Sequence, residues 1–283
     1  MTNRNDCMET HRPWTEYTYV AFDTETSGAY PVGADVIEFG AVKWRGGQEV
    51  GTYQTLLKPR ELLSDFNMSI HGISNEMVAE APKMAEKIRE IRDFLTGAVC
   101  MAHHAPFDLG FMALEFETHK LPLPTEPVLC TSLLSRKWIH GSENHKLQTL
   151  VKFLNLEGGA AHRALDDARA CLQVGMECFR RMGENFTLDQ VLKSQGKNLQ
   201  WSDYSLIRWN NPLVNVLMEA VYQKKDVEIV YEKSASAKAE PRHLTPLGIV
   251  RNPDGDYLQA FCLRDHASKR FYLSKIKDAA LIY

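Results

Sequence analysis

Three features that would each point to a particular class of protein are absent from this sequence of 283 residues. No apolar run approaches the roughly 20 residues that a membrane-spanning helix needs, so we expect no membrane span. The six cysteines include no C-x-x-C pair and no spacing typical of disulfides, and we therefore expect free thiols in a reducing cytoplasm. The formal net charge is only −3, so charge alone identifies no class of partner.

The sequence also lacks internal repeats and low-complexity tracts. Its composition, 44% hydrophobic and 24% charged, is that of an ordinary globular protein, and its length suits two domains better than one. The polar N-terminal residues lack the apolar core of a secretory signal. We expect a disordered lead-in over residues 1–14, a first domain over 15–182, a linker over 183–212 and a second domain over 213–283.

The first domain begins with strands and continues with alternating strands and helices. Apolar residues alternate in three early segments, which predicts an antiparallel meander. Helical spacing of apolar residues then predicts four helices, with two short buried strands between the first three of them. This order predicts an α/β domain with a mixed sheet. The expected early strands are residues 17–23, 36–44 and 49–57, the later strands AVCMAHH and 128–130, and the helices 82–95, 106–119, 146–154 and 164–182.

The second domain is predicted to be small and rich in strands. An amphipathic helix covers LVNVLMEAVYQKK, and the strand VEIVYEK follows it. The segment PLGIVRNPDGDYLQAFCLR predicts a hairpin, because NPDGD supplies turn residues between two apolar runs. The last segment, RFYLSKIKDAALIY, is expected to form one strand.

Two carboxylates stand side by side in FDTET, directly after the apolar run YTYVA. Residues two apart in a strand point to the same face, so Asp23 and Glu25 are expected to be neighbours. Like charges a few ångströms apart repel each other, and burial makes each charge less stable. A divalent cation between them would offset both the repulsion and the cost of burial.

Further carboxylates follow at positions that could reach the same point. HHAPFD places Asp108 in the first turn of a helix, and EGGAAHRALDDARA places His162 in a loop and Asp167 at a helix start. Four carboxylates without a thiolate or histidine cluster favour Mg²⁺ or Mn²⁺. Four are also more than one Mg²⁺ usually takes from protein, so we expect two ions roughly 4 Å apart.

A pair of such ions suits phosphodiester hydrolysis. One ion activates a water molecule, and the other stabilises the leaving oxygen. The reaction also needs a base to accept the proton of the water. His162 has a suitable pKa range and lies on a loop five residues before Asp167.

FDTET, HHAPFD and HRALDDA together resemble the three motifs of the DEDDh family of 3′–5′ exonucleases. The resemblance covers about residues 15–182 and implies an RNase H-like fold and nucleoside 5′-monophosphate products. By position it implies that Asp23, Glu25, Asp108 and Asp167 bind metal and that His162 is the general base. It also implies substrate contacts from Thr24, Thr26, His71 (in SIHGIS) and Phe107.

Two positions depart from the family pattern. His104 stands in HHAPFD where the family commonly has Asn, so the orienting contact expected of that Asn is in doubt. Ser27 replaces a commoner Thr, which is a milder change. The five positions that match the catalytic residues are all intact.

The C-terminal 70 or so residues resemble the WYL domain of bacterial regulators. EIVYEK, PRHLTPLGIV, DYLQAFC and KRFYLSKI follow the order of that family, although Asp256 stands where its Trp would be. The resemblance implies an Sm-like β-barrel that senses a ligand such as single-stranded nucleic acid. Proteins bind single strands by combining basic groups, which contact the phosphates, with aromatic rings, which stack on the bases. The candidates for this role are Arg242, His243, Tyr257, Arg264, Arg270 and Lys275.

The expected function is therefore 3′–5′ exonuclease activity on single-stranded ends, with DNA as the expected substrate and RNA as the alternative. The motifs do not separate the two, because the chemistry does not require the 2′-hydroxyl. A non-catalytic nucleic-acid sensor is a third hypothesis, and it predicts the loss of a metal ligand. None is lost. Protein partners and oligomeric state are left open by the sequence.

Overall fold

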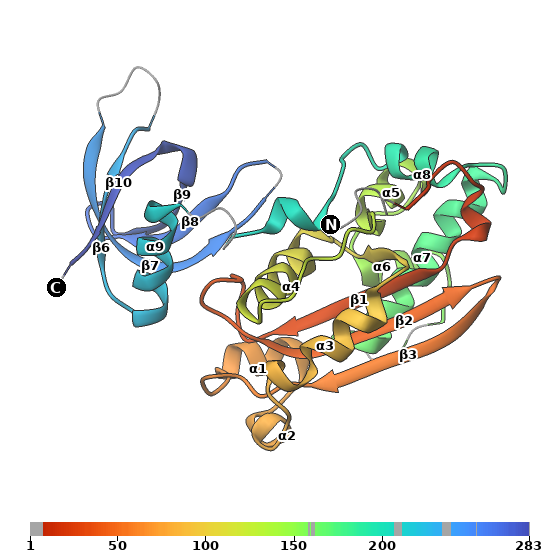
Figure 1. Cartoon of the computed structure of the whole chain (residues 1–283), viewed down its shortest axis with the longest axis horizontal. Helices are drawn as coiled ribbons and strands as arrows, with labels where there is room; N and C mark the ends of the chain where they lie inside the picture. The colour runs from red at the N-terminus through yellow and green to blue at the C-terminus, as the bar shows by residue number, and fades with distance from the viewer. Residues whose placement is uncertain are drawn as a thin grey trace, which may run out of the picture.

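A five-stranded mixed sheet forms the centre of the N-terminal domain (Figure 1). The computed structural model describes residues 8–157, 159, 162–206, 211–233, 239–252 and 254–282. The strands lie in the order β3-β2-β1-β4-β5, with β1 to β3 antiparallel and β4 and β5 parallel to β1. The predicted meander and mixed sheet are therefore confirmed. The strands are β1 (Tyr19–Thr26), β2 (Val36–Arg45), β3 (Gln48–Leu56), β4 (Val99–Ala102) and β5 (Val128–Cys130).

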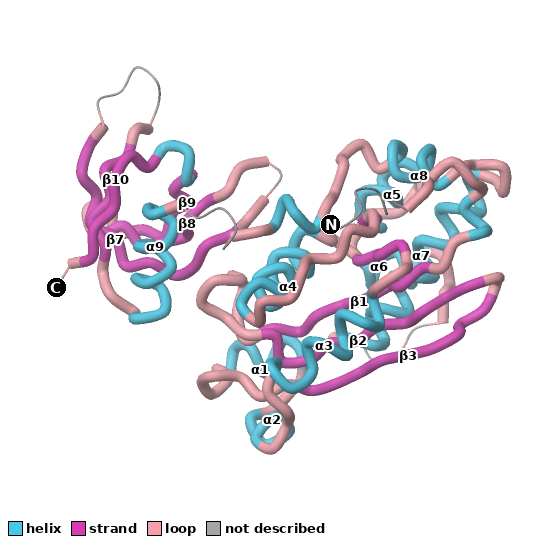
Figure 2. The backbone as a smooth tube through the Cα atoms, in the orientation of Figure 1, coloured by secondary structure: helices cyan, strands magenta, loops and turns pink. Residues whose placement is uncertain are grey.

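Helices cover both faces of this sheet, as the ribbon and the tube both show (Figures 1 and 2). The long helix α7 packs under β1 and β2, and α3 and α4 pack on the opposite face. Val20 and Phe22 of β1 join the α3–α4 core, whereas Tyr19 and Ala21 join the α7 core. The helices of this domain are α1 (Asp65–His71), α2 (Asn75–Ala79), α3 (Met84–Leu95), α4 (Pro106–Thr118), α5 (Thr131–Trp138), α6 (Leu147–Phe153), α7 (Ala164–Met182) and α8 (Leu188–Ser194).

The alternation along β1 also decides where its acidic residues point. Asp23 and Glu25 continue the series of Tyr19 and Ala21, so they face α7. The predicted helices over 82–95, 106–119, 146–154 and 164–182 form close to their expected bounds. The short helices α1 and α5 are additional to those predicted from apolar spacing.

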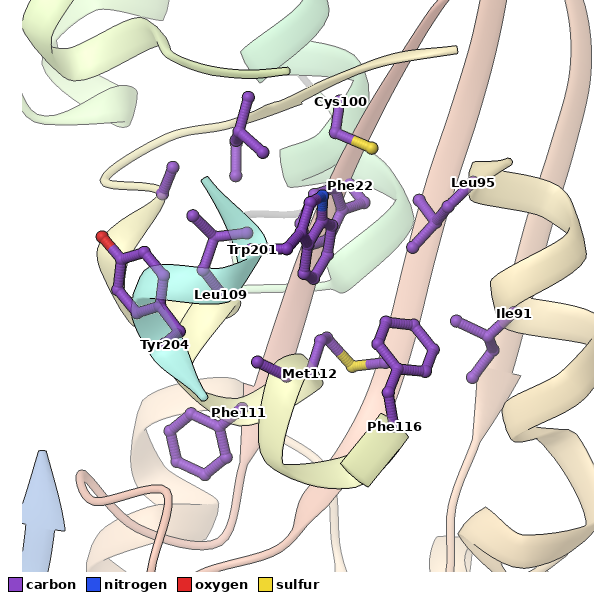
Figure 3. Close-up of a cluster of buried hydrophobic side chains, with 14 of the residues drawn as sticks. Phe22, Ile91, Leu95, Cys100, Leu109, Phe111, Met112, Phe116, Trp201 and Tyr204 are labelled. Carbon is purple, nitrogen blue, oxygen red and sulfur yellow. The ribbon is translucent and has the colours of Figure 1, made fainter. Parts of the chain in front are cut away.

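The segment expected as a linker packs into the N-terminal domain. Trp201, in a short 3₁₀ turn (Trp201–Tyr204), is 1% exposed and stacks on Phe22 with ring centroids 5.8 Å apart. Figure 3 shows this indole between β1 and α4. Buried Glu117 of α4 accepts a hydrogen bond from the Leu206 backbone N–H at 2.9 Å. Residues 188–206 therefore complete the core of the first domain.

The described part of the N-terminal lead-in is also fixed in place. Pro13 forms an isolated antiparallel bridge with Thr187, and the backbone of Arg12 accepts a hydrogen bond from Leu188 N–H at 3.0 Å. Trp14 packs into the α7 core. The disorder expected over residues 1–14 therefore does not extend to residues 12–14, and residues 1–7 lie outside the described part of the chain.

The C-terminal domain is a five-stranded antiparallel sheet with one helix packed on it (Figure 1). Its strands lie in the order β10-β6-β7-β8-β9, and no closing pair between β9 and β10 is found among the described residues. The single strand expected over RFYLSKIKDAALIY is wrong: a 3₁₀ turn (Leu273–Lys275) splits it, so that its halves pair at opposite edges. The elements are α9 (Pro212–Gln223), β6 (Val227–Tyr231), β7 (Glu240–Val250), β8 (Tyr257–Cys262), β9 (Ala267–Tyr272) and β10 (Ile276–Leu281).

The two domains share a packed contact through the loop between β1 and β2. Val32 of this loop is fully buried in the core of the C-terminal domain and forms an antiparallel bridge with Ile249. Gly248 is required there, because a Cβ atom at this position would lie 2.3 Å from the Cβ of Tyr30. Lys224, directly after α9, also forms an ion pair with Glu61 at 2.6 Å.

The expectations on cysteines and membrane spans agree with the described residues. Five cysteines there are buried and unpaired, and Cys7 lies outside the described part. Among the described helices, none combines the length and apolar character needed to cross a bilayer.

The burial of Trp201 leads to a stability prediction. Trp201→Ala should lower the free energy of unfolding by about 3–5 kcal/mol, because it removes a large side chain from a packed core. Leu62→Ala is the control, since Leu62 is 84% exposed and should change stability by less than about 0.5 kcal/mol. Urea unfolding measures both values, and a loss below about 1 kcal/mol for Trp201→Ala would contradict the assignment of this segment to the core.

Candidate active site

The first two acidic residues of the site lie at the end of β1, on the face covered by α7. The pKa of Asp23 is raised well above its usual range, mainly by burial and then by the negative charges of Asp108 and Glu25. The pKa of Glu25 is raised to about 8, mainly by burial and then by the charge of Asp167. These shifts show that the carboxylates oppose one another's ionisation when no cation is present.

The third acid comes from the first turn of α4, whose N-terminus follows β4. Pro106 occupies the first turn, where a missing N–H is tolerated. Asp108 is buried, and its Oδ1 accepts hydrogen bonds from the backbone N–H of Thr24 at 3.1 Å and the Thr24 hydroxyl at 2.8 Å. Burial raises the pKa of Asp108 to about 7 even though these bonds lower it. Both donors of Thr24 therefore orient Asp108.

The fourth acid and the predicted base come from the start of α7. Asp167 Oδ2 accepts a hydrogen bond from His162 N–H at 2.9 Å, and its Oδ1 accepts one from the Gln148 side chain at 2.8 Å. Ligand atoms of Glu25, His162 and Asp167 all lie within 4.8 Å of one another. Burial raises the pKa of Asp167, although the bond from His162 N–H lowers it. The predicted base and two of the predicted acids thus converge.

A buried ion pair that the sequence did not predict holds this region together. Glu38 of β2 lies opposite Glu25 in the strand register and is fully buried. It accepts hydrogen bonds from the Arg163 guanidinium at 2.8 and 3.2 Å and from Ala164 N–H at 3.1 Å. Burial opposes ionisation of Glu38, but the bonds from Arg163 and Ala164 lower its pKa overall. The only signal in the sequence is a single acidic residue inside the apolar strand VIEFGAV.

A glycine next to this ion pair lets α7 approach the sheet closely. A Cβ atom at Gly40 would lie 2.1 Å from the backbone nitrogen of Leu165 and 2.3 Å from the carbonyl carbon of Ala164. The first turn of α7 therefore rests directly on the backbone of β2. Glu38 and Gly40, two residues apart on one strand, together fix the height and position of the turn that carries Asp167.

His71, at the end of α1, has a buried nitrogen without a partner. Its side chain is 5% exposed, and its Nδ1 accepts a hydrogen bond from Ile73 N–H at 3.0 Å, so neutral His71 carries its proton on Nε2. Nε2 has no hydrogen-bond partner among the described residues. Burial lowers the pKa of His71, and the charge of Glu38 partly opposes this shift.

Thr26, Phe107 and His104 make local contacts near the site. The Thr26 hydroxyl donates a hydrogen bond to Gly28 carbonyl at 2.7 Å and so stabilises the turn after β1. The ring of Phe107 packs on Phe111 with centroids 5.0 Å apart. His104, which replaces the common Asn, adopts a positive φ of 65° immediately before α4. Burial lowers its pKa.

Most of the basic candidates in the C-terminal domain are paired with acids. Arg242 and Arg264 both contact Glu240, and His243 contacts Glu228. Arg270 instead lies over the ring of Tyr257 at 4.8 Å, and Lys275 lies 5.8 Å from the ring centroid of Tyr272. Asp256, which replaces the family Trp, accepts a hydrogen bond from Asn252 N–H at 3.0 Å and so closes the turn between β7 and β8.

The donor set at the end of β1 suits a divalent metal ion. It offers carboxylate oxygens and one imidazole, and a bound cation would stabilise the anionic carboxylates whose ionisation burial opposes. Hydrolytic chemistry of a phosphodiester requires such charge neutralisation together with a base, and His162 lies next to the acids.

Comparison with protein families agrees with this geometry. The family described as Exonuclease (RNase_T) matches residues 20–174, and the WYL domain family matches residues 212–281. The first match begins in β1, includes α4 and ends within α7, so it contains all the residues of the acidic cluster.

Among curated proteins, the chain is similar to DNA polymerase III of the PolC type. It is 35% identical over 162 residues to the protein of Oceanobacillus iheyensis and 34% identical over 161 residues to that of Bacillus subtilis. The matched regions cover 57% and 56% of this chain but only 11% of each relative, so the chain spans about a tenth of their length.

Solved structures share the fold at low identity. The nuclease domain of 3′hExo, a DEDDh family member, aligns with a TM-score of 0.51 and 17% identity over 62% of this chain and 96% of that one. E. coli Exonuclease I, in complex with a dA16 oligonucleotide, aligns with a TM-score of 0.56 and 15% identity over 94% of this chain and 63% of that one. The second likeness extends beyond the exonuclease domain.

The matched families, the RNase H-like α/β fold and the acidic cluster agree with one another. This chain therefore belongs to the exonuclease family, and it consists of a DEDDh-type 3′–5′ exonuclease domain, which is a phosphodiester hydrolase, followed by a WYL domain.

Proposed function

We propose that this chain removes nucleoside 5′-monophosphates one at a time from the 3′ ends of single-stranded DNA. The observation that carries this proposal is the convergence of Glu25, His162 and Asp167 within 4.8 Å at the end of β1. DNA is favoured as substrate because the similar curated relatives are DNA polymerases. The shared region is a small part of those relatives, so we take from them the class of nucleic acid and no polymerase partner.

The acidic residues would hold two Mg²⁺ or Mn²⁺ ions, through Asp23, Glu25, Asp108 and Asp167. When bound, these ions would neutralise the charge that develops on the scissile phosphate and favour ionisation of the attacking water. His162 lies on the exposed side of the cluster, where it would accept the proton of that water. Thr24 would keep Asp108 oriented through its two hydrogen bonds.

His71 would contribute substrate binding. Its Nε2–H is a buried donor that finds no acceptor in the part of the chain that the structure describes, and such a group is destabilised until a ligand supplies an acceptor. A phosphate or sugar oxygen of the terminal nucleotide would supply that acceptor. Phe107 would form part of the wall of the same pocket, and Thr26 would support it by fixing the turn after β1.

The WYL domain would bind the single strand that leads to the active site. We propose that its antiparallel sheet is of the Sm-like barrel type and that Arg270, Tyr272 and Lys275 form the binding face, with buried Tyr257 supporting Arg270 from below. Their aromatic rings and cations lie together on β8, β9 and the turn after β9, and such groups stack bases and hold phosphates. Arg242, His243 and Arg264 are paired with acids and lie toward the opposite end of β7 to β9, so we assign them no direct contact with the strand at this face.

Removal of one acid should abolish the reaction. Wild type with Mg²⁺ should shorten 5′-labelled single-stranded DNA stepwise from its 3′ end, with slower degradation of the matching RNA. Asp23→Ala should lower the rate by at least about 100- to 1,000-fold, as expected when transition-state charge loses its stabilisation. Gel electrophoresis of 5′- and 3′-labelled strands measures the direction and the rate.

Asp166→Ala is the matched control, since Asp166 lies in the same helical turn but outside the converging group, and it should retain nearly full activity. Faster degradation of RNA would replace DNA by RNA as the substrate. Tight oligonucleotide binding without any degradation would instead support a sensor.

Binding of metal should depend on pH in a defined direction. In the metal-free fold, the pKa values of Glu25 and Asp108 are about 8 and 7, so both carboxyls retain protons near neutral pH that a metal ion must displace. Mn²⁺ should therefore raise the melting temperature more at about pH 8.5 than at about pH 6.5. Differential scanning fluorimetry measures the shift, and a larger shift at the lower pH would contradict the proposed ligands. Asp23→Ala should reduce the shift at both values.

The ion pair between Glu38 and Arg163 should act on catalysis by positioning the start of α7. Glu38→Gln keeps the size of the side chain but removes its charge, so we expect kcat to fall about 10- to 100-fold with a nearly unchanged KM. Steady-state kinetics on a labelled oligonucleotide measures both constants. Glu90→Gln, on the exposed face of α3, is the control, and an equal loss there would argue against a specific role for Glu38.

A further inference from the structure

A cavity of about 560 Å³ lies where the two domains meet, away from the acidic cluster. Its walls come from the β1–β2 loop, the segment after β3, the start of α3 and the end of α4, and Tyr222 of α9 completes it from the WYL domain. None of the residues proposed for catalysis lines it. Its volume falls within the roughly 300–1,000 Å³ of small-molecule sites, which often lie between domains.

One end of the cavity is suited to an anion. Lys58 N–H donates a hydrogen bond to Pro82 carbonyl at 2.9 Å, so the backbones of Lys58 and Lys83 lie side by side, and both residues line the cavity. Neither ammonium forms an ion pair with a carboxylate in the described parts of the chain. Met84 and Ala85, in the first turn of α3, also line this end. The Glu86 carboxylate already accepts a hydrogen bond from Lys83 N–H at 2.8 Å at this helix start, so the positive charge available to an anion comes from the two ammonium groups.

The other side of the cavity is suited to a flat ring. The Arg60 guanidinium is held by Asp35 at 2.6 Å and lies 5.1 Å from the centroid of the Tyr222 ring. Pro31, Pro59 and Leu114 supply apolar surface around them. A nucleobase has a flat apolar face and would pack against these groups as it does against aromatic rings and arginine planes in nucleic-acid sites.

A carboxyl group in the same cavity can form hydrogen bonds with polar atoms at the edge of such a ring. Glu115 is mostly buried, its Oε2 lies 3.5 Å from His119 Nδ1, and both residues line the cavity. Burial raises the pKa of Glu115 to about 7, so its carboxyl can both donate and accept hydrogen bonds near neutral pH. The donors and acceptors on the edge of a purine are matched by such a group.

From this arrangement we propose that the cavity is a second, non-catalytic binding site for a nucleoside 5′-monophosphate. The phosphate would lie at Lys58, Lys83 and the start of α3, and the base would lie beside Tyr222. The choice of this ligand rests on the proposed function, because a nucleoside 5′-monophosphate is its product. A ligand here would contact both domains at once, together with the β1–β2 loop that follows the acidic strand β1.

The test measures binding of AMP and dAMP to the full chain by isothermal titration calorimetry in the presence of EDTA. Without divalent metal, no bound cation remains at the catalytic cluster to attract a phosphate, so the remaining binding reports the cavity. We expect saturable binding that weakens at least tenfold in Lys58→Ala/Lys83→Ala and in Tyr222→Leu. Lys87→Ala is the matched control on α3, because Lys87 is paired with Glu90 outside the cavity and should bind as wild type does.

Three results would overturn the proposal: no saturable binding in EDTA, equal binding by the cavity variants and wild type, or loss of binding in Asp23→Ala. Binding of inorganic phosphate as tight as that of AMP would overturn the assignment to a nucleotide, since it would show no contribution from the base. Circular dichroism of each variant confirms that it is folded. Because the assay needs neither metal nor catalysis, its failure is distinguishable from failure of the strand-degradation assay.

Discussion

The repulsion between buried carboxylates is the constraint on which the rest of the exonuclease domain depends. Burial raises the pKa values of Asp23, Glu25 and Asp108, and neighbouring negative charges raise those of Asp23 and Glu25 further, so this cluster destabilises the fold unless surrounding elements hold it. The sheet, α4 and α7 each contribute one part of it, and hydrogen bonds join β1 to α4 through Thr24 and Asp108 and α6 to α7 through Gln148 and Asp167. The same repulsion that destabilises the metal-free fold favours the binding of cations between these carboxylates.

The sequence predicted the parts of this site that depend on local pattern. FDTET, HHAPFD and HRALDDA each combine a short spacing with a recognisable strand or helix context, so their five acidic and basic side chains could be named in advance. Glu38 could not be assigned in this way, because its partner Arg163 is 125 residues away. The partnerless Nε2 of His71 likewise depends on how α1 packs against the sheet, which no local periodicity encodes.

The larger differences from expectation have similar physical causes. Scattered polar residues made 183–212 resemble a linker, yet the described residues 188–206 are held by a few large contacts, above all those of Trp201 with Phe22 and Phe116. The continuous apolar pattern of RFYLSKIKDAALIY predicted one strand, but its halves pair with β8 and β6 at opposite edges of the sheet. In both cases tertiary contacts outweigh the local composition.

The contact between Tyr30 and Gly248 has a consequence for how such two-domain chains can be recombined. Val32 belongs to the catalytic domain by sequence but to the WYL core by burial, and Gly248 accepts it only because it has no Cβ. A WYL domain with any other residue at this position could not pack against the β1–β2 loop unless the loop moved. The packing of the two domains at this junction therefore depends on the absence of a side chain at position 248.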